Sequence, residues 1–561
     1  MTSTARTLCA LLVLALLTAS CSLSDGESAT PAADSTSREP SRTEQSAPES
    51  AEPQQAGPGK GPDKASKQTG NASAAVQPGW GPTRAQIRRA RAAVARMSLP
   101  EKAGQVIVAR YGGTAPPTRL IRRYHLGGVI VMEDNAASID AVRRSNARLQ
   151  RADRRPWPLF LGVDQEGGIV NRLNAPMTGF PTLMTHGASN RPDLARAAAR
   201  ASAEELRAAG FTVVFAPDAD VTIGAGDPTI GSRSVGSRPK QVARIVTAMV
   251  GGYRAAGIMP VVKHFPGHGS VGTDSHLGLP VQNASMRTLR QRDLVPFRAA
   301  IGVDAPVTMI GHLDVRAVDP RTPSTLSRPV ITGLLRKRMG FDGLVVTDAM
   351  EMGAIVEGYG TGDAAVRSIR AGVDTLLMPA DLPTAHRAIV RGVRSGRLPR
   401  SRLDQAATRT VALLMHQQAQ RRAPGAGAIG SHAGASYRAS KAAVTVVKGR
   451  CSGRLVGRGV SVSGDSEAAS AFRAAARRRG LSTSGGTSVA FLGYADSARS
   501  GDVVVTTDTP YALRQSRART KIALYGDSRG AMRALVDVLL GRERAPGHLP
   551  VRVRGVPRQG C

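Results

Sequence analysis

Eight short apolar segments between residues 103 and 379 constrain the fold of this chain most strongly. They are nearly continuous in hydrophobicity, which is typical of parallel strands that are covered on both faces. Helical segments separate several of them, and eight such units over about 300 residues favour a (β/α)8 barrel. A doubly wound open sheet is the structural alternative. The eight segments are 103–110, 127–132, 158–164, 211–217, 258–265, 305–313, 341–350 and 373–379.

Amphipathic patterns predict helices between and after these segments. Residues 193–210 and 239–257 each end at a glycine that suits a helix C-cap, and residues 403–420 form a last helical pattern. We therefore place the barrel at residues 83–420. Residues 421–436 are rich in Gly, Ala and Ser, and this composition predicts a linker.

The rest of the chain, residues 437–561, again alternates apolar strands with helical stretches. Its strand-like runs lie at residues 442–449, 488–495, 502–508 and 521–527. Because each run is short and helical segments separate them, the pattern predicts a small α/β unit. We expect a second, smaller α/β sandwich-like domain after the barrel.

The N-terminal residues predict export. Residues 7–17 form an apolar segment behind Arg6; it is too short to span a bilayer, which needs about 20 residues, but it suits a signal-peptide core. The small residues before Cys21 resemble a bacterial lipobox, which implies a signal peptide over residues 1–20 and lipidation of the Cys21 thiol. Residues 22–82 hold almost no large apolar side chain and predict a disordered tether. The expected location is the extracellular face of the cell membrane, lipid-anchored or secreted.

The four cysteines of the chain fit an oxidising compartment. Cys9 would leave with the signal peptide, and Cys21 would carry the lipid. Cys451 and Cys561 then remain as a possible disulfide, which would close the C-terminal region.

The charge of the chain is strongly positive. Lys and Arg number 76 against 42 Asp and Glu, which gives a net charge of +34. Aromatic residues are only 3%, which argues against a stacking platform for single-stranded nucleic acid. The arginines are scattered among Ala and Gly and form no single basic stripe, so we expect no nucleic-acid partner. A basic surface would still be attracted to the anionic polymers of a cell envelope.

Polar side chains gather where the predicted strands end, and these ends share one rim of a barrel. Acids, imidazoles and cations that converge on one rim favour a functional site, although each alone could be a helix cap or a structural residue. The polar residues at this rim are Asp164, Glu166, Arg172, Arg233, Lys263, His264, His268, Asp274, His276, His312 and Asp348.

Several sequence blocks resemble the signature blocks of family 3 glycoside hydrolases, and in particular the β-N-acetylglucosaminidase branch. Residues 97–105 are similar to the family's first barrel element. The resemblance is strong over residues 90–420 and weaker over the second domain. The signature-like blocks are VDQEGGIVNRL (163–173), DPTIGSRSVGS (227–237), KHFPGHGSVGTDSHLGLP (263–280) and LVVTDAMEMGAI (344–355).

This resemblance implies a retaining hydrolase that forms a covalent glycosyl-enzyme. Asp348 matches the nucleophile, His276 matches the general acid/base, and Asp274 matches the carboxylate that holds and polarises the imidazole. A carboxylate suits attack on an oxocarbenium-like carbon, and imidazole titrates near neutral pH. The residues that match the family's sugar-binding positions are Asp164, Arg172, Arg233, Lys263 and His264.

The expected substrates are terminal non-reducing β-linked N-acetylglucosamine residues of peptidoglycan fragments or chito-oligosaccharides, with no cofactor and no metal. Alternatives within the family are a phosphorylase, which a histidine acid/base would permit because it does not repel phosphate, and a β-glucosidase. A metal hydrolase with histidine and aspartate ligands is a further alternative. The last is a non-catalytic, lipid-tethered wall-binding protein.

Overall fold

A computed structural model describes residues 79–153, 155–420, 422–493 and 500–558. The predicted signal peptide, Cys21 and Cys561 lie outside these ranges, as does the predicted tether up to residue 78. Trp80, near the end of that predicted tether, is buried and belongs to the hydrophobic core. The folded body therefore begins a few residues earlier than the composition indicated, because one large aromatic side chain packs against it.

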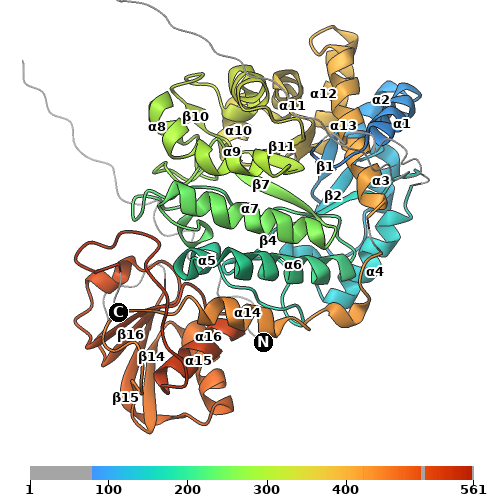
Figure 1. Cartoon of the computed structure of the whole chain (residues 1–561). Helices are drawn as coiled ribbons and strands as arrows, with labels where there is room; N and C mark the ends of the chain where they lie inside the picture. Colours follow the sequence, from blue (N-terminus) through green and yellow to red (C-terminus); the bar gives the residue numbers. More distant parts are fainter. Residues whose placement is uncertain (1–78, 154, 421, 494–499, 559–561) are drawn as a thin grey trace, which may run out of the picture. The chain divides into compact units, whose positions relative to one another are not determined.

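Eight parallel strands close into a barrel, which confirms the predicted fold and excludes the open sheet (Figure 1). Each of the eight predicted apolar segments supplies one strand. Around the barrel the strands follow the order β1-β12-β11-β9-β7-β6-β3-β2. Their bounds are β1 Ile107–Ala109, β2 Gly128–Val131, β3 Phe160–Val163, β6 Val213–Val214, β7 Met259–Phe265, β9 Val307–Ile310, β11 Leu344–Ala349 and β12 Thr375–Leu377.

The helices around the barrel begin and end at residues that suit helix termini. Helices α6 (Pro192–Ala208) and α7 (Pro239–Ala255) both begin with proline, whose fixed φ suits the first helical position. Gly210 and Gly257 follow them with φ of +90° and +79°, which a residue with a side chain adopts only with strain. The other helices are α1 Arg84–Ala95, α2 Leu99–Gln105, α3 Thr118–Tyr124, α4 Ile139–Gln150, α5 Leu183–Ser189, α8 Met286–Gln291, α9 Leu294–Gly302, α10 Gly353–Tyr359, α11 Thr361–Ala371, α12 Leu382–Arg394 and α13 Arg400–Gln418.

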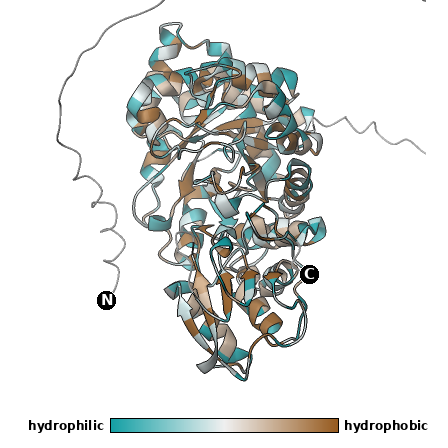
Figure 2. Cartoon of the chain, turned by 90° about the vertical axis from the view of Figure 1, so that its left-hand side faces the viewer, coloured by the Kyte–Doolittle hydropathy of each residue, from teal (hydrophilic) through white to brown (hydrophobic). Residues whose placement is uncertain are grey.

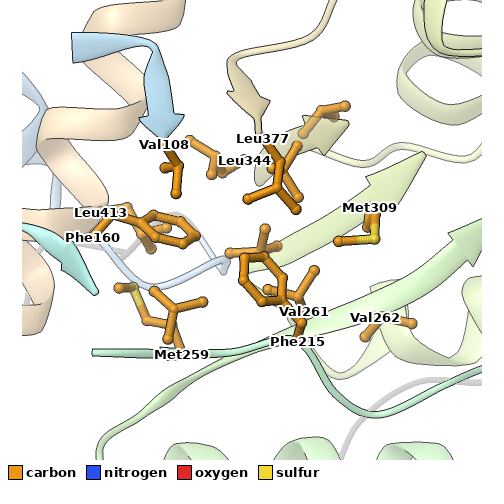
Figure 3. Close-up of a cluster of buried hydrophobic side chains, with 14 of the residues drawn as sticks. Val108, Phe160, Phe215, Met259, Val261, Val262, Met309, Leu344, Leu377 and Leu413 are labelled. Carbon is orange, nitrogen blue, oxygen red and sulfur yellow. The ribbon is translucent and has the colours of Figure 1, made fainter. Parts of the chain in front are cut away.

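Apolar side chains fill the inside of the barrel (Figure 3). Phe160 and Phe215 are fully buried there, and their ring centroids lie 5.9 Å apart. Figure 2 shows the hydrophobic residues concentrated on the strands, while the helices alternate between hydrophobic and hydrophilic turns. The barrel is therefore a packed core rather than a pore, and polar chemistry is confined to its rim.

The second domain contains a five-stranded sheet of order β13-β17-β16-β15-β14, in which only β13 is antiparallel to its neighbour. Four strands were predicted; the fifth, β14 (Gly459–Gly464), was not. The domain's α/β class is as expected. The other elements are β13 Thr445–Lys448, β15 Ser482–Leu492, β16 Val503–Thr506, β17 Thr520–Ala523, α14 Ala433–Lys441, α15 Ser466–Arg478 and α16 Arg529–Leu539.

Three further observations bear on the predicted organisation of the chain. Helix α14 begins at Ala433, inside the predicted linker, because its buried residues Ser436 and Ala439 pack against other elements. Cys451 is disulfide-bonded, while the pairing with Cys561 stays a prediction. Among the described residues, no helix has both the length and the apolar character needed to cross a membrane.

Candidate active site

A cavity of about 380 Å³ lies at the carboxyl ends of the barrel strands. Seven of the eight side chains predicted for catalysis and sugar binding line it, and the eighth, Asp274, is hydrogen-bonded to one of them. Residues far apart in sequence meet here because parallel strands place their carboxyl ends on one rim. The seven lining residues are Asp164, Arg172, Arg233, Lys263, His264, His276 and Asp348.

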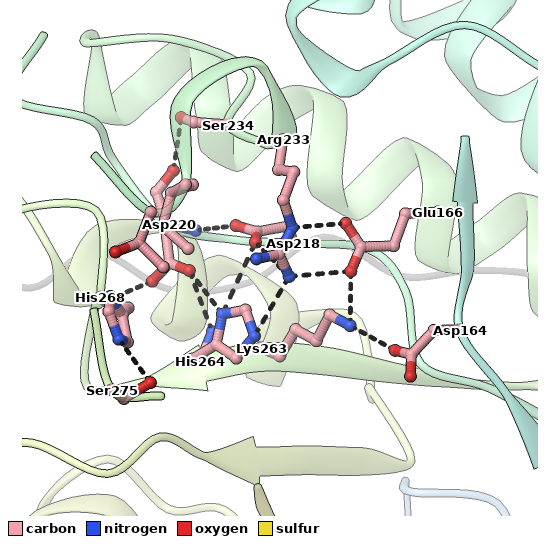
Figure 4. Close-up of polar contacts among 12 residues, drawn as sticks. Asp164, Glu166, Asp218, Asp220, Arg233, Ser234, Lys263, His264, His268 and Ser275 are labelled. Atoms are coloured by element: carbon pink, nitrogen blue, oxygen red, sulfur yellow. Dashed lines mark hydrogen bonds and ion pairs between the residues drawn. The ribbon is translucent and has the colours of Figure 1, made fainter. Parts of the chain in front are cut away.

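A buried ion network forms one wall of the cavity (Figure 4). The Lys263 Nζ atom lies 2.8 Å from Asp164 Oδ1 and 2.6 Å from Glu166 Oε1. The Arg233 guanidinium donates two hydrogen bonds of 2.9 Å to the two carboxylate oxygens of Glu166. The Glu166 side chain is only 1% exposed, so its carboxylate holds both cations in place away from water.

Charge and burial oppose each other in this network. Burial alone would raise the pKa of Glu166, but Arg233 and Lys263 outweigh it and hold that pKa well below its usual range. Burial likewise disfavours the charged form of Lys263, yet Asp164 and Glu166 raise its pKa. Glu166, Arg233 and Lys263 therefore stay charged near neutral pH.

His264 is held from the opposite side by a buried carboxyl pair. Its Nδ1 atom lies 2.7 Å from Asp220 Oδ2 and 3.6 Å from Asp218 Oδ2. Its Nε2 atom lies 3.4 Å from the Arg233 guanidinium, which can only donate. Burial lowers the pKa of His264. The neutral tautomer that fits these partners carries its proton on Nδ1 and leaves Nε2 as an acceptor facing the cavity.

The carboxyl groups of Asp218 and Asp220, behind His264, are both buried. Burial and the neighbouring Asp220 carboxyl raise the pKa of Asp218 well above its usual value, and burial raises the pKa of Asp220 to about 7. The Asp218 Oδ2 atom is buried and accepts no hydrogen bond from a described residue. Two buried carboxylates this close do not both ionise readily, which explains why the pKa of each is raised.

Oxygen and nitrogen atoms of Asp218, Asp220 and His264 come within 4.8 Å of one another, a spacing that could hold a metal ion. In the described part of the chain this is the one such group. The 2.7 Å contact between Asp220 and His264 is a hydrogen-bond distance, and it is shorter than two ligands of one tetrahedral ion would usually adopt. The hydrogen-bonded arrangement therefore accounts for these atoms better than a metal centre does.

Asp348 lies at the carboxyl end of β11 and faces the cavity. One of its oxygens accepts a 2.8 Å hydrogen bond from the N–H of Ala349. Although burial opposes ionisation, the imidazoles of His264 and His312 and this N–H lower the pKa of Asp348 to about 2. The group is thus an anionic carboxylate with one oxygen held and the other available to react.

His276 and Asp274 lie on the loop after β7. The Nδ1 atom of His276 is 2.7 Å from Asp274 Oδ1, and this pairing orients Nε2 as the exchangeable proton site. The imidazole is 68% exposed and is therefore in contact with water. The Nε2 atom of His268 lies 3.1 Å from Ser275 Oγ, a hydrogen-bond distance. This contact connects the loop to the segment that directly follows β7.

The structure adds residues to which the family resemblance assigns no role. The sequence pattern places Glu166 and His312 at strand ends but does not single out Asp218 and Asp220. Two aspartates spaced by one residue directly after an apolar run were the available signal. Four methionines also line the cavity: Met132, Met309, Met352 and Met378.

Comparison with known proteins identifies the family. Residues 98–413 match the model of the glycosyl hydrolase family 3 N-terminal domain, which is more than half of the chain. The chain belongs to glycosyl hydrolase family 3. The site described above lies within the matched region, at the carboxyl ends of the barrel strands, where barrel enzymes hold their catalytic residues.

Relatives within the family bear hexosaminidase names. The Beta-hexosaminidase A of Pseudoalteromonas piscicida is 36% identical over 287 residues, which cover 47% of this chain but only 48% of that protein. The chain thus spans about half the length of that relative. The Beta-hexosaminidase LpqI of Mycobacterium tuberculosis is 34% identical over 57% of this chain and 83% of its own.

A solved structure resembles both domains. It is a glycoside hydrolase family 3 beta-N-acetylglucosaminidase from a Paenibacillus species, with 29% identity and a TM-score of 0.74. The match covers 82% of this chain and 99% of the other. The second domain is therefore part of an architecture that this family 3 chain shares with a two-domain relative.

Proposed function

We propose that this family 3 protein hydrolyses terminal non-reducing β-linked N-acetylglucosamine residues, with retention of configuration. The observation that carries the proposal is the meeting, in one cavity, of an ionised carboxylate, Asp348, with the imidazole–carboxylate pair of His276 and Asp274. The hexosaminidase names of the relatives support the choice of sugar. Peptidoglycan fragments or chito-oligosaccharides are the natural substrates that fit this chemistry.

The reaction runs in two balanced steps. A carboxylate oxygen of Asp348 attacks the anomeric carbon while His276 gives its proton to the leaving oxygen, so the C–O bond to the leaving group breaks as the ester forms. Neutral His276 then takes a proton from water, whose oxygen attacks the same carbon and releases Asp348. Two inversions give net retention. Asp274 keeps the imidazole in the tautomer that presents Nε2 throughout.

The remaining residues of the cavity bind the sugar. Charged donors and acceptors with fixed partners form directional hydrogen bonds to hydroxyl groups. Lys263 and Asp164 present a linked donor and acceptor at the cavity wall. The buried Nε atom of Arg172, at the cavity wall, has no hydrogen-bond partner in the described structure and is a candidate donor to substrate.

We also propose that the protein is exported and held at the membrane by a lipid on Cys21. The apolar segment 7–17 and the small residues before Cys21 support this placement. A tether of about 60 residues would have an end-to-end distance of roughly 40–45 Å, which lets the barrel reach polymer near the membrane.

The acid/base role of His276 is tested with two leaving groups. In His276→Ala, kcat/KM for a methyl β-N-acetylglucosaminide is expected to fall by about 10²–10⁴-fold, because methoxide must be protonated to leave. The nitrophenyl analogue should lose far less. Release of nitrophenol and of free sugar measures both. His548→Ala, in the second domain, is the control and should leave both rates unchanged. An equal loss with both substrates would remove His276 from this role.

A further inference from the structure

Exposed aliphatic side chains gather around the catalytic cavity. Among the described residues, five large hydrophobic side chains are exposed, and four of them lie on segments that also carry residues of the cavity lining. These four, Ile169, Ile223, Leu277 and Val356, are 62%, 47%, 81% and 37% exposed. Exposed apolar groups that cluster at a functional site commonly mark a binding surface. The fifth, Val303, is 40% exposed and lies elsewhere.

Two of the four follow strands β3 and β6, which are neighbours in the barrel. Ile169 lies in the turn between β4 (Gln165–Gly167) and β5 (Val170–Asn171), directly before Val170, which lines the cavity. Ile223 belongs to the loop after β6, and its N–H donates a 2.9 Å hydrogen bond to the carbonyl of Gly269. That contact places Ile223 next to the turn that carries His268 of the cavity wall.

The other two lie beside the acid/base. Leu277 follows His276 directly, and its side chain is the most exposed of the four. The carbonyl oxygen of His276 lies 2.9 Å from the position that a Cβ atom on Gly353 would occupy. The first turn of α10 therefore packs against this loop. Val356 is three residues further along α10 and shares the helix face of Gly353.

The four residues therefore come from segments that follow β3, β6, β7 and β11, which lie within a run of five neighbouring strands of the closed barrel. Val303 instead follows α9 and precedes β9, so it lies at the amino ends of the strands, away from the cavity. The acid/base protonates the leaving oxygen, and the side of the cavity that holds His276 is thus where the leaving group lies. Leu277 and Val356 lie on this side, beside His276, and Ile223 contacts Gly269 in the same loop after β7.

The cavity lining also contains methionine and aliphatic residues but, among the described residues, no Trp, Tyr or Phe. An aromatic ring offers a flat apolar face to a sugar ring, whereas branched aliphatic side chains offer none. The aliphatic side chains at the rim therefore bind most favourably to another aliphatic group, because the contact removes the apolar surface of both from water.

We propose that Ile169, Ile223, Leu277 and Val356 form a leaving-group subsite that selects leaving groups with an aliphatic substituent over unsubstituted ones. The inference rests on the proposed glycosidase function and names the class of its leaving group. The rim acts through apolar contact, so its contribution to kcat/KM grows with the length of the aliphatic group and does not depend on the chemistry of bond cleavage.

The test is a series of n-alkyl β-N-acetylglucosaminides from methyl to hexyl, whose leaving groups have nearly the same basicity. Complete burial of each methylene would raise kcat/KM by about fourfold, and an open rim is expected to give about twofold. Leu277→Ser and Ile169→Ser should flatten this dependence while the methyl glycoside reacts at nearly the wild-type rate. Val303→Ser, a change of the same kind at an exposed site remote from the cavity, should keep the wild-type dependence.

Several outcomes would overturn the inference. A flat series in the wild type, or an unchanged slope in both rim variants, would show that the rim makes no contact with the leaving group. An equal loss for all chain lengths in Leu277→Ser would show that Leu277 acts on the catalytic loop instead. If neither the alkyl nor the nitrophenyl glycosides react with the wild type, the proposed function itself fails.

Discussion

Replacing Asp348 with Asn is expected to lower kcat by on the order of 10⁴- to 10⁶-fold, because the amide cannot form the glycosyl ester. Asn keeps the shape of the side chain and can still accept the hydrogen bond from the Ala349 N–H. The loss should therefore be chemical rather than structural. Steady-state release of nitrophenol from the β-N-acetylglucosaminide measures it, and urea unfolding confirms that the variant is folded.

A smaller variant identifies the role of Asp348 more directly. In Asp348→Ala, added azide can enter the space that the carboxylate leaves and attack the anomeric carbon, which expels nitrophenolate and forms the α-glycosyl azide. Recovery of turnover with that product supports the nucleophile. Recovery with the β-azide, or near-wild-type activity of the Asn variant without azide, would assign the nucleophile elsewhere.

Replacing Glu166 with Ala is expected to destabilise the fold by about 3–5 kcal/mol, because it leaves two buried cations without their shared carboxylate. Arg233 would lose both of its 2.9 Å hydrogen bonds and Lys263 its 2.6 Å contact. Urea unfolding measures the change. The control is Glu351→Ala, which removes a 2.8 Å ion pair with Arg110 between side chains that are 32% and 45% exposed. An exposed pair of this kind contributes less than about 1 kcal/mol.

The pH dependence of the Glu166 effect has a definite sign. The pKa of Glu166 is depressed in the folded state, so its contribution is present above the unfolded value of about 4.3 and is lost as the pH falls toward the folded value. The stability difference between wild type and Glu166→Ala should thus shrink below about pH 4.5. A difference that stays constant, or that matches the Glu351→Ala control at neutral pH, would contradict the buried network.

The barrel could be predicted because its strands are buried on both faces, which leaves an unbroken apolar signal in the sequence. Strand β14 gives no such signal. It is the edge strand of the second sheet, and its Gly-Val-Ser-Val-Ser-Gly sequence exposes the serines. The composition does not reveal where α14 begins either, because glycine and alanine near Ala433 are equally typical of a linker.

The site could be predicted where candidate residues lie at or near the carboxyl end of a strand, as Asp164, Lys263 and Asp348 do. Asp218 and Asp220 lie beyond β6, which has only two residues, so the strand gave no register from which to place them. The bidentate pairing of Arg233 with Glu166 joins segments 67 residues apart. Such a contact depends on how the loops close over the rim, and local sequence patterns carry no information on that.

The configuration of the first product tests the central claim most directly. Proton NMR during the opening minutes of hydrolysis of the nitrophenyl β-N-acetylglucosaminide distinguishes the anomers before mutarotation mixes them. Two inversions at the anomeric carbon, through an ester of Asp348, predict that free β-N-acetylglucosamine forms first, in buffer with or without phosphate. The α-anomer as first product would contradict a covalent intermediate on Asp348, and a sugar 1-phosphate as main product in phosphate buffer would contradict hydrolysis.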